Sequence, residues 1–403
     1  MNDGGWNDME RERLTNQFIQ THKEQCCGCY ACANICPVHA IEMREDEEGF
    51  LYPHVDEGKC VKCGRCAAVC QMMNGRKSAH GCSREVYACM NLNMEERMAS
   101  SSGGVFILLA KQVLAQGGQV FGAAFDEKAQ VRHEGASDLE GCRQFMGSKY
   151  VQSTIGNTFS EAKRLLEKGV PVLFSGTPCQ IHGLRLFLGK DYENLYTVDI
   201  ICHGVPSPEV FSAYKTAAFE IFGKKVCNVQ FRDKSSGWKQ YSITWDLNGG
   251  EKKTVLHGQS AYMKGFLSDL YLRPSCYQCQ NKEGNYFSDL TLGDYWGVEK
   301  KDPDMDDEKG TSVILLHTDK GRALFGKIRD DLKIKTAELE YVIRCNSSIV
   351  KPVDMNPNRN HFFRELKDGT TDVHTLIWKY QRRSSRWVRC REALLKTLGI
   401  RRK

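Results

Sequence analysis

Short apolar runs alternate with longer segments of helical spacing through most of the chain after residue 84. Most of the runs are separated from the following helical segment by a loop of small residues or proline. This order of strand, loop and helix predicts an α/β layer with a largely parallel or mixed sheet. The predicted strands are 85–90, 119–125, 171–174, 195–201 and 312–317, and the predicted helices are 105–114, 180–188, 208–222 and 320–330.

Three further apolar segments, 226–231, 241–247 and 254–257, follow one another without helices between them. The glycine pair Gly249–Gly250 supplies a tight turn between the last two. We therefore expect an antiparallel insertion in the α/β domain.

A dense group of cysteines precedes the α/β region. Apart from Cys27, it forms two runs with the spacing Cys-x2-Cys-x2-Cys-x3-Cys, and Pro37 follows the first run. In bacterial two-cluster ferredoxins, the fourth cysteine of such a run binds the other cluster. The spacing thus predicts an α+β ferredoxin-like module with two [4Fe-4S] clusters, one held by Cys26, Cys29, Cys32 and Cys70 and the other by Cys60, Cys63, Cys66 and Cys36.

The alternatives for closely spaced cysteines are zinc and disulfides. A zinc ion takes four ligands, so two complete runs would be surplus. Disulfides fit a chain with an export signal better, and the first residues lack that pattern. Gly28 and Gly64 suit a backbone that turns closely around inorganic sulfide. Cys27 stands at a position that is not a ligand, and we interpret it as a small filler residue.

The charge of the chain is concentrated at one end. Residues 379–403 contain ten Lys or Arg and one Glu, whereas the whole chain has a net charge of +6. The remainder is slightly acidic, so we expect no nucleic-acid partner. No apolar run approaches the length of a bilayer span, and iron–sulfur clusters favour the reducing cytoplasm.

Apolar residues at 376–378, 387–388 and 394–395 recur among the arginines of the tail. This spacing is typical of a basic helix on an anionic membrane surface or on a partner protein, and equally of a solvated terminal helix.

The length and these patterns divide the chain into an N-terminal arm (1–20), the ferredoxin module (21–78), the α/β domain (82–350, in parts 82–160 and 168–350) and a C-terminal extension (351–403).

Loops of small residues lie directly before two predicted helices, at Ser101–Gly104 and at Gly176–Thr177. Unpaired N–H groups and the helix dipole favour an anion at such a position. An ordinary tight turn is the alternative for each loop.

Seven motifs together resemble the coenzyme F420 hydrogenase/dehydrogenase beta-subunit family over about residues 21–350. They are Ser101–Gly104, Gly147–Ser153, Gly176–Gln180, Cys202–Ser207, Phe231–Lys234, Cys276–Cys279 and Gly293–Gly297. The resemblance implies a flavin and iron–sulfur oxidoreductase, with FAD on the α/β domain beside a [4Fe-4S] cluster. Some members also carry a fused two-cluster ferredoxin.

The resemblance implies roles for particular residues. The FAD candidates are Ser101, Ser102, Gly103, Gly104, Gly147, Ser148, Lys149, Tyr150, Gly176 and Thr177, and the candidate ligands of a third [4Fe-4S] cluster are Cys179, Cys202, Cys276 and Cys279. Only Cys276 and Cys279 have ligand spacing by themselves, so buried free thiols are the alternative. The other cysteines, which we interpret as structural, are Cys82, Cys89, Cys142, Cys227, Cys345 and Cys390.

Other polar residues in these motifs each have two interpretations. His203 is a candidate proton donor near the flavin or a hydrogen-bonded structural residue. Arg232 and Lys234 would hold an anionic substrate or phosphates, or would form a solvated charge cluster. Asp294 would line a substrate pocket or cap a turn before a strand.

Two functions follow from the resemblance. The first is an enzyme that moves electrons between the ferredoxin clusters and FAD to reduce or oxidise a small organic acceptor, either an F420-like deazaflavin or another conjugated substrate. The second is an electron-transfer subunit that docks on a hydrogenase or dehydrogenase complex and exchanges electrons with a donor or acceptor protein. A metal-binding scaffold without flavin is a third interpretation.

Overall fold

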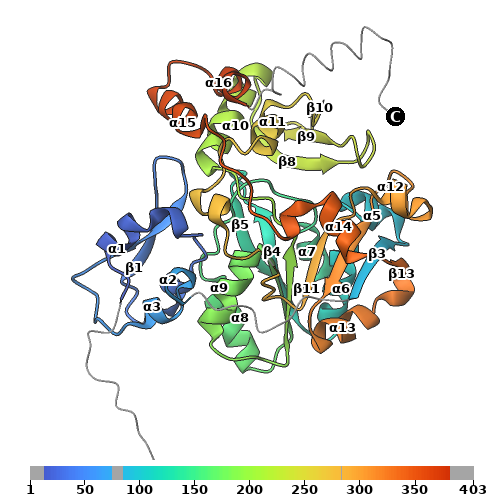
Figure 1. Ribbon diagram of the computed structural model, residues 1–403, viewed down its shortest axis with the longest axis horizontal. Helices are drawn as coiled ribbons and strands as arrows, with labels where there is room; N and C mark the ends of the chain where they lie inside the picture. The colour runs from blue at the N-terminus through green and yellow to red at the C-terminus, as the bar shows by residue number, and fades with distance from the viewer. Residues whose placement is uncertain (1–12, 75–84, 283, 382–403) are drawn as a thin grey trace, which may run out of the picture.

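The computed structural model describes residues 13–74, 85–282 and 284–381. In this part of the chain, the largest sheet has eight strands in the order β13-β3-β12-β11-β7-β6-β4-β5 (Figure 1). These strands are β3 (Glu85–Asn91), β4 (Gln119–Phe125), β5 (Val131–Ala136), β6 (Val172–Gly176), β7 (Leu195–Ile200), β11 (Leu290–Asp294), β12 (Ser312–Leu316) and β13 (Leu332–Thr336).

The centre of the sheet is parallel and its two sides are antiparallel. β4, β6, β7 and β11 are parallel neighbours. β5 pairs antiparallel with β4 at one edge, and β12, β3 and β13 form antiparallel pairs at the other. The sheet is therefore mixed.

Both faces of the central strands are buried by helices. On β4, Val120 and Ala124 pack with α6 (Val105–Leu114) and α13 (Asp319–Gly326), whereas Phe121 packs with α8 (Thr158–Glu167) and α9 (Pro178–Leu188). Burial on both faces explains why these strands appear in the sequence as continuous apolar runs. The shorter helices of this domain are α5 (Met94–Ala99), α7 (Leu139–Arg143), α12 (Val298–Lys301) and α14 (Leu339–Cys345).

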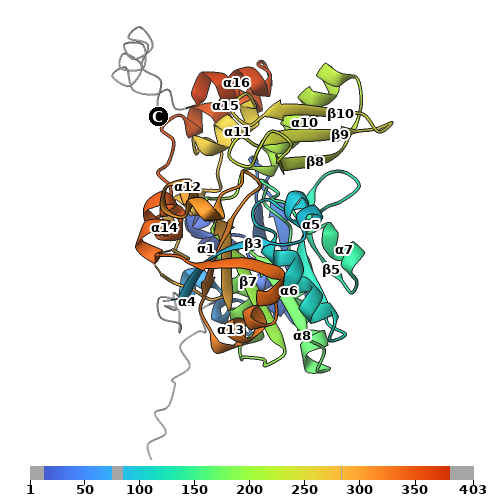
Figure 2. The ribbon, with the colours of Figure 1, turned by 90° about the vertical axis from the view of Figure 1, so that its right-hand side faces the viewer.

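The predicted antiparallel insertion is a separate three-stranded sheet, drawn at the top of Figures 1 and 2. It consists of β8 (Val226–Asp233), β9 (Ser242–Leu247) and β10 (Lys252–Leu256), and it shares one core with α10 (Pro208–Phe222), α11 (Ala261–Leu267), α15 (Arg359–Asp368) and α16 (Val373–Tyr380). Leu376 and Ile377 are buried in this core, so the first apolar residues of the predicted tail helix pack inside the protein. The rest of the predicted basic helix, 382–403, lies outside the described residues.

The ferredoxin module lies beside the α/β domain, at the left of Figure 1. Its antiparallel hairpin is β1 (Ile41–Glu45) and β2 (Leu51–Val55), and its helices are α1 (Asn16–Thr21), α2 (Ala31–Ile35), α3 (Arg65–Ala68) and α4 (Gln71–Asn74). The Asn16 side chain donates to the Val55 carbonyl at 2.8 Å and accepts from the Val55 N–H at 2.7 Å. These bonds attach α1, which belongs to the predicted N-terminal arm, to the hairpin. Residues 1–12 of that arm lie outside the described part. No helix in the described ranges is long and apolar enough to cross a membrane.

The turn of the hairpin joins the module to the C-terminal half of the chain. The Glu48 carboxylate accepts two hydrogen bonds from the Arg359 guanidinium, and the Glu48 carbonyl accepts one from the Ser207 hydroxyl. Next to it, Gly49 has a φ of +77°, and a Cβ there would stand 2.5 Å from the backbone nitrogen of Glu209. Only glycine fits this turn.

Gly49→Ala is expected to lower the stability of the protein more than Gly249→Ala. Gly249 has a φ of +82° with no atom within 4 Å of its Cβ position, so its substitution costs only the backbone strain of about 1–2 kcal/mol. Gly49→Ala adds a steric clash with the α10 backbone, worth a further ~1–3 kcal/mol. Thermal unfolding of the two variants under anaerobic conditions measures the difference, and equal melting temperatures would show that the hairpin turn does not dock.

Candidate functional site

The eight cysteines of the ferredoxin module are presented by two similar loops, each followed by a short helix. Gly28 and Gly64 have φ values of +66° and +73°, as the tight turns require. Cys32 lies near Cys26, Cys29 and Cys70, and also near Cys66 of the second run, so the two cysteine runs lie side by side. The crossed assignment of the eight ligands to two clusters stays a prediction.

Several sulfur atoms in the module accept hydrogen bonds. The Ala40 N–H donates to Cys36 Sγ at 3.2 Å, Arg13 Nη1 to Cys60 Sγ at 3.6 Å, and Arg273 Nη2 to Cys26 Sγ at 3.9 Å. Donors of this kind stabilise the negative charge of cluster thiolates. The donor set therefore fits two iron–sulfur clusters.

The four remaining candidate ligands meet at a second place. Cys179 lies in the first turn of α9, Cys202 lies just after β7, and Cys276 and Cys279 lie on and after the short 3-10 helix Pro274–Gln278. β6 and β7 are neighbours, so the chain segments that follow them come together at one edge of the sheet. All four side chains line one open cavity of about 640 Å³.

The same cavity has a fifth cysteine in its wall, Cys27 of the ferredoxin module. Nothing in the sequence indicated that Cys27 lies in this wall, because the spacing of the cysteine run does not show what packs against the run. Across the described residues, no three Cys, His, Asp or Glu side chains converge on a point that would hold a single metal ion. All five thiols line this one cavity.

Arg273 lies between the two groups of cysteines. Its guanidinium is fully buried and donates to the Cys26 carbonyl at 2.7 Å, to Gln152 Oε1 at 2.8 Å and to the Leu51 carbonyl at 3.0 Å. It also lies 4.2 Å from the centre of the Tyr52 ring. This permanent positive charge is close to both sites and favours thiolates and added electrons there.

The cavity cysteines differ in their acid–base properties. A hydrogen bond from the Cys27 thiol, assisted by Thr177 and Arg273, lowers the pKa of Cys179 to about 6. Burial raises the pKa of Cys202 to about 12. Among these thiols, Cys179 is thus the one whose ionised form is most favoured.

His203 lines the cysteine cavity, and its Nε2 lies 2.7 Å from Asp269 Oδ1. Its edge meets the ring of Phe266, with 5.1 Å between the centroids. The carboxylate and the ring fix the imidazole, which fits the structural interpretation of this residue. Its predicted role as proton donor stays a prediction.

The FAD candidates occupy two places. Ser101 Oγ accepts from the Ser148 N–H at 2.6 Å, which joins the first two loops. Gly103 packs so tightly that a Cβ would stand 2.2 Å from the Cys89 carbonyl, and Lys149 donates to the Gln144 and Met146 carbonyls. Gly176 and Thr177 lie instead beside the cysteine cavity, where the Thr177 hydroxyl is 3.2 Å from Cys179 Sγ.

Arg232, Lys234 and Asp294 are linked to the first of these places. Arg232 makes a bidentate ion pair with Asp294, and its Nη1 donates to the Tyr150 hydroxyl at 3.2 Å. Lys234 donates to the Arg97, Ser102 and Lys309 carbonyls, and burial lowers its pKa to about 7. Both basic residues are buried, so the interpretation as a solvated cluster is wrong.

The position of Asp294 differs from one of its two sequence interpretations. It is the last residue of β11 and does not cap a turn before a strand. Its partner Arg232 has a buried Nε without a hydrogen-bond partner within the part of the chain described. An orphaned donor beside the Ser101 and Ser148 loops fits an acceptor atom of a bound molecule.

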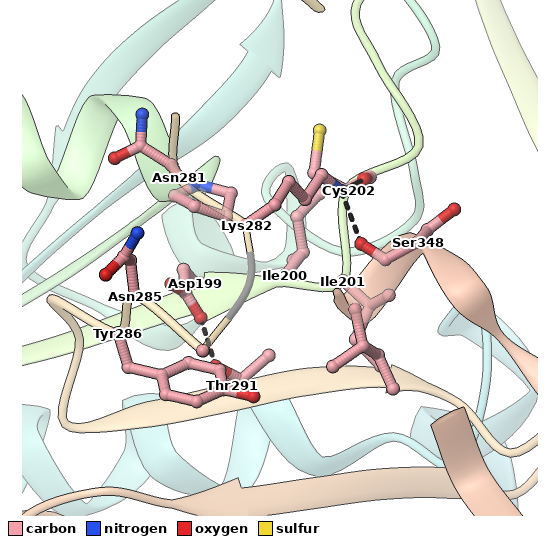
Figure 3. Close-up of a pocket in the computed structure, with 13 residues that line it drawn as sticks. Asp199, Ile200, Ile201, Cys202, Asn281, Lys282, Asn285, Tyr286, Thr291 and Ser348 are labelled. Atoms are coloured by element: carbon pink, nitrogen blue, oxygen red, sulfur yellow. Dashed lines mark hydrogen bonds between the residues drawn. The ribbon is translucent and has the colours of Figure 1, made fainter. Parts of the chain in front are cut away.

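A second cavity, of about 340 Å³, adjoins the cysteine cavity and shares Cys202, Asn281 and Lys282 with it. Figure 3 shows Asp199 in this cavity, with its carboxylate accepting from the Thr291 hydroxyl at 2.5 Å. Burial raises the pKa of Asp199 to about 7. No motif in the sequence singles out this residue, and the available signal was a single acid inside the apolar strand 195–201.

Asp199→Asn is expected to stabilise the protein at pH 8 and to have little effect at pH 4. A raised pKa means that the folded state binds a proton more tightly than the unfolded state, so wild-type stability falls as the pH rises from about 4 to about 7. The full difference is at most ~4 kcal/mol. Melting temperatures at both pH values test this expectation, with Asp191→Asn as the exposed control. The same change in both variants would contradict it.

Comparison with known proteins finds matches for the two segments that carry the candidate ligand cysteines. Residues 25–73 match the 4Fe-4S dicluster domain, and residues 170–341 match the family described as the C terminus of the coenzyme F420 hydrogenase/dehydrogenase beta subunit. No curated protein matches the chain.

Among solved structures, one chain of the xenon-derivatised F420-reducing [NiFe] hydrogenase complex from Methanosarcina barkeri is similar. It is 17% identical, with a TM-score of 0.45, and the match covers 73% of this chain and 91% of that one. The expected two-cluster module and the family resemblance are confirmed by the family matches. Residues 25–73 thus form a 4Fe-4S dicluster domain, and residues 170–341 form a C-terminal domain of the coenzyme F420 hydrogenase/dehydrogenase beta-subunit type.

Proposed function

We propose that this protein is an iron–sulfur flavoprotein oxidoreductase that links its dicluster domain to a third [4Fe-4S] site and to FAD, and that acts on a small organic acceptor. When bound, the clusters supply one-electron transfers and FAD exchanges electrons singly or as a hydride. F420-like deazaflavins and other conjugated molecules are the proposed acceptors. We place this activity in the cytoplasm, because cluster thiolates need a reducing compartment.

The observation that carries the proposal is the convergence of Cys179, Cys202, Cys276 and Cys279 on one cavity against the ferredoxin module. The residues come from three separate segments, and all four lie within residues 170–341. Basic groups surround the cavity: Arg273 lies at its wall, and Lys282 donates to the Cys202 carbonyl. A cluster with four thiolates carries net negative charge, so this environment suits it.

The support for FAD is of a different kind. It consists of the joined loops at Ser101 and Ser148 and the unpartnered Arg232 Nε beside Tyr150. The first two loops lie outside the residues matched by the family, whereas Gly176 and Thr177 lie inside them. Flavin content is therefore measured separately from iron content.

A second candidate function is an electron-transfer subunit that docks on a larger complex, and the exposure of the ferredoxin module supports it. The predicted ligands of the second cluster are only partly buried, whereas Cys26, Cys32 and Cys70 of the first are buried. Val61, between Cys60 and Cys63, is 59% exposed. An exposed apolar residue beside a cluster suits contact with a protein partner.

Anaerobically purified protein is expected to contain about twelve irons and one FAD per chain, since each cubane holds four irons. The double variant Cys276→Ala/Cys279→Ala should lose about four irons and keep the eight of the dicluster domain. Cys142→Ala, which removes a buried thiol remote from the cavity, should keep all of them. About eight irons in the wild type would contradict the third site, and absence of flavin would contradict the enzyme.

The two candidate functions differ in the behaviour of the isolated chain. An enzyme reduced with dithionite should transfer electrons to a soluble deazaflavin or another conjugated acceptor in repeated turnovers. A dependent subunit should be reduced by dithionite but turn over no such acceptor until a partner complex is added. Absorbance of the acceptor, followed with and without the chain, separates these results.

A further inference from the structure

Gln71 directly follows Cys70, a predicted ligand of the dicluster domain, and it begins the helix α4. Its side chain reaches beyond its own module and lines the cysteine cavity. Only 5% of the residue is exposed, so its amide group needs partners inside the protein. The amide finds two of them in the α/β domain.

Both ends of the Gln71 amide are hydrogen-bonded across the boundary between the module and the α/β domain. Its Nε2 donates to the Cys179 carbonyl at 2.7 Å, and its Oε1 accepts from Asn281 Nδ2 at 3.1 Å. Cys179 is a proposed ligand of the third site, and Asn281 lies two residues after another, Cys279. One side chain therefore holds two of the three chain segments that would supply the ligands.

The bond to Asn281 continues into a second buried contact. Asn281 Oδ1 lies 2.9 Å from His182 Nδ1, and both residues are buried. The His182 ring stacks on Phe287 with 3.6 Å between the centroids, which fixes its orientation. Because His182 and Cys179 both lie on α9, the series of contacts from Gln71 returns to the helix that carries this ligand.

The helix α9 also approaches the module closely at a glycine. At Gly183, a Cβ would stand 2.9 Å from Cys29 Sγ and 3.4 Å from Gln71 Nε2. A larger residue would push the helix and the first cysteine loop apart, because the first of these distances is shorter than Cβ contacts in proteins. The close approach and the Gln71 bonds together fix Cys179 relative to Cys70.

We propose that Gln71 is a positioning residue, which holds the third site at a fixed separation from the dicluster domain for electron transfer between them. This inference rests on the proposed function. In that step one electron leaves a reduced dicluster site and is gained by the oxidised third site, and no bond forms or breaks at Gln71. Electron transfer slows steeply as two centres move apart, so the segments that carry the ligands need hydrogen bonds that hold them in place.

The test is pulsed electron paramagnetic resonance of the full-length protein, fully reduced with dithionite under anaerobic conditions, because magnetic coupling between two sites reports their separation. Gln71→Met keeps the length of the side chain and removes both hydrogen bonds. Gln71→Glu keeps the acceptor for Asn281 and removes the donor to Cys179. Both variants are expected to keep about twelve irons and to lose part of the coupling between the third site and the dicluster domain.

Gln116→Met is the matched control. Gln116 is an exposed glutamine whose amide donates to the Gln112 carbonyl at 2.7 Å, beyond the C-terminal end of α6. This variant should keep both the iron content and the coupling of the wild type. The same loss of coupling in the control as in Gln71→Met would contradict a specific role for Gln71.

Two further results would overturn the inference alone. Wild-type coupling in both Gln71 variants would show that the amide does not position the third site. Loss of about four irons in either variant would make Gln71 necessary for assembly of the site and not for its placement. By contrast, wild-type protein with only about eight irons would remove the third site and the proposed function together, before any variant is compared.

Discussion

The placement of one buried guanidinium joins the two halves of this protein. Arg273 has no exposed surface, and its donors are divided between the ferredoxin module, through Cys26 and Leu51, and the α/β domain, through Gln152. A Cβ at Gly28 would stand 2.8 Å from its Nη1, so the first cysteine loop can close only over glycine. Removing a partner from a buried charge costs several kcal/mol, which makes this contact a strong constraint on how the halves sit together.

The same residue lies at the wall of the cavity that holds the proposed third site. Arg273 is directly followed by the 3-10 helix that presents Cys276 and leads to Cys279. The segments after β6 and β7 supply Cys179 and Cys202 at the same edge of the sheet. The parallel centre of the sheet thus brings distant parts of the sequence together, and Arg273 aligns them with the module that carries Cys27 and Cys29.

The sequence predicted those features that are encoded locally. Local patterns predicted the ferredoxin module, the helix α10 and the strand β4. The structure has α10 and β4 at the expected positions. β5 was missed because its exposed positions are polar and its interior contains Gly135, and β13 because Lys333 and Lys335 interrupt its apolar pattern. Edge strands contribute one buried face or less, so their signal is weak.

The site was predicted less completely than the fold. Cys179 and Cys202 were candidate ligands only through the family resemblance, and the position of Cys27 in the same cavity depends on how two modules pack, which no local pattern encodes. The burial of Asp199 and the pairing of Arg232 with Asp294 also depend on contacts between distant segments. Charged residues within apolar strands were the only sign of either.

The central claim is that the dicluster domain and the cysteine cavity form one continuous redox unit. Pulsed electron paramagnetic resonance of the fully reduced chain tests it most directly, because magnetic coupling between clusters falls steeply with distance. The account predicts three cluster signals, with the cavity site coupled to the dicluster site that contains Cys29. A cavity signal that is uncoupled, or the presence of the two dicluster signals alone, would contradict it.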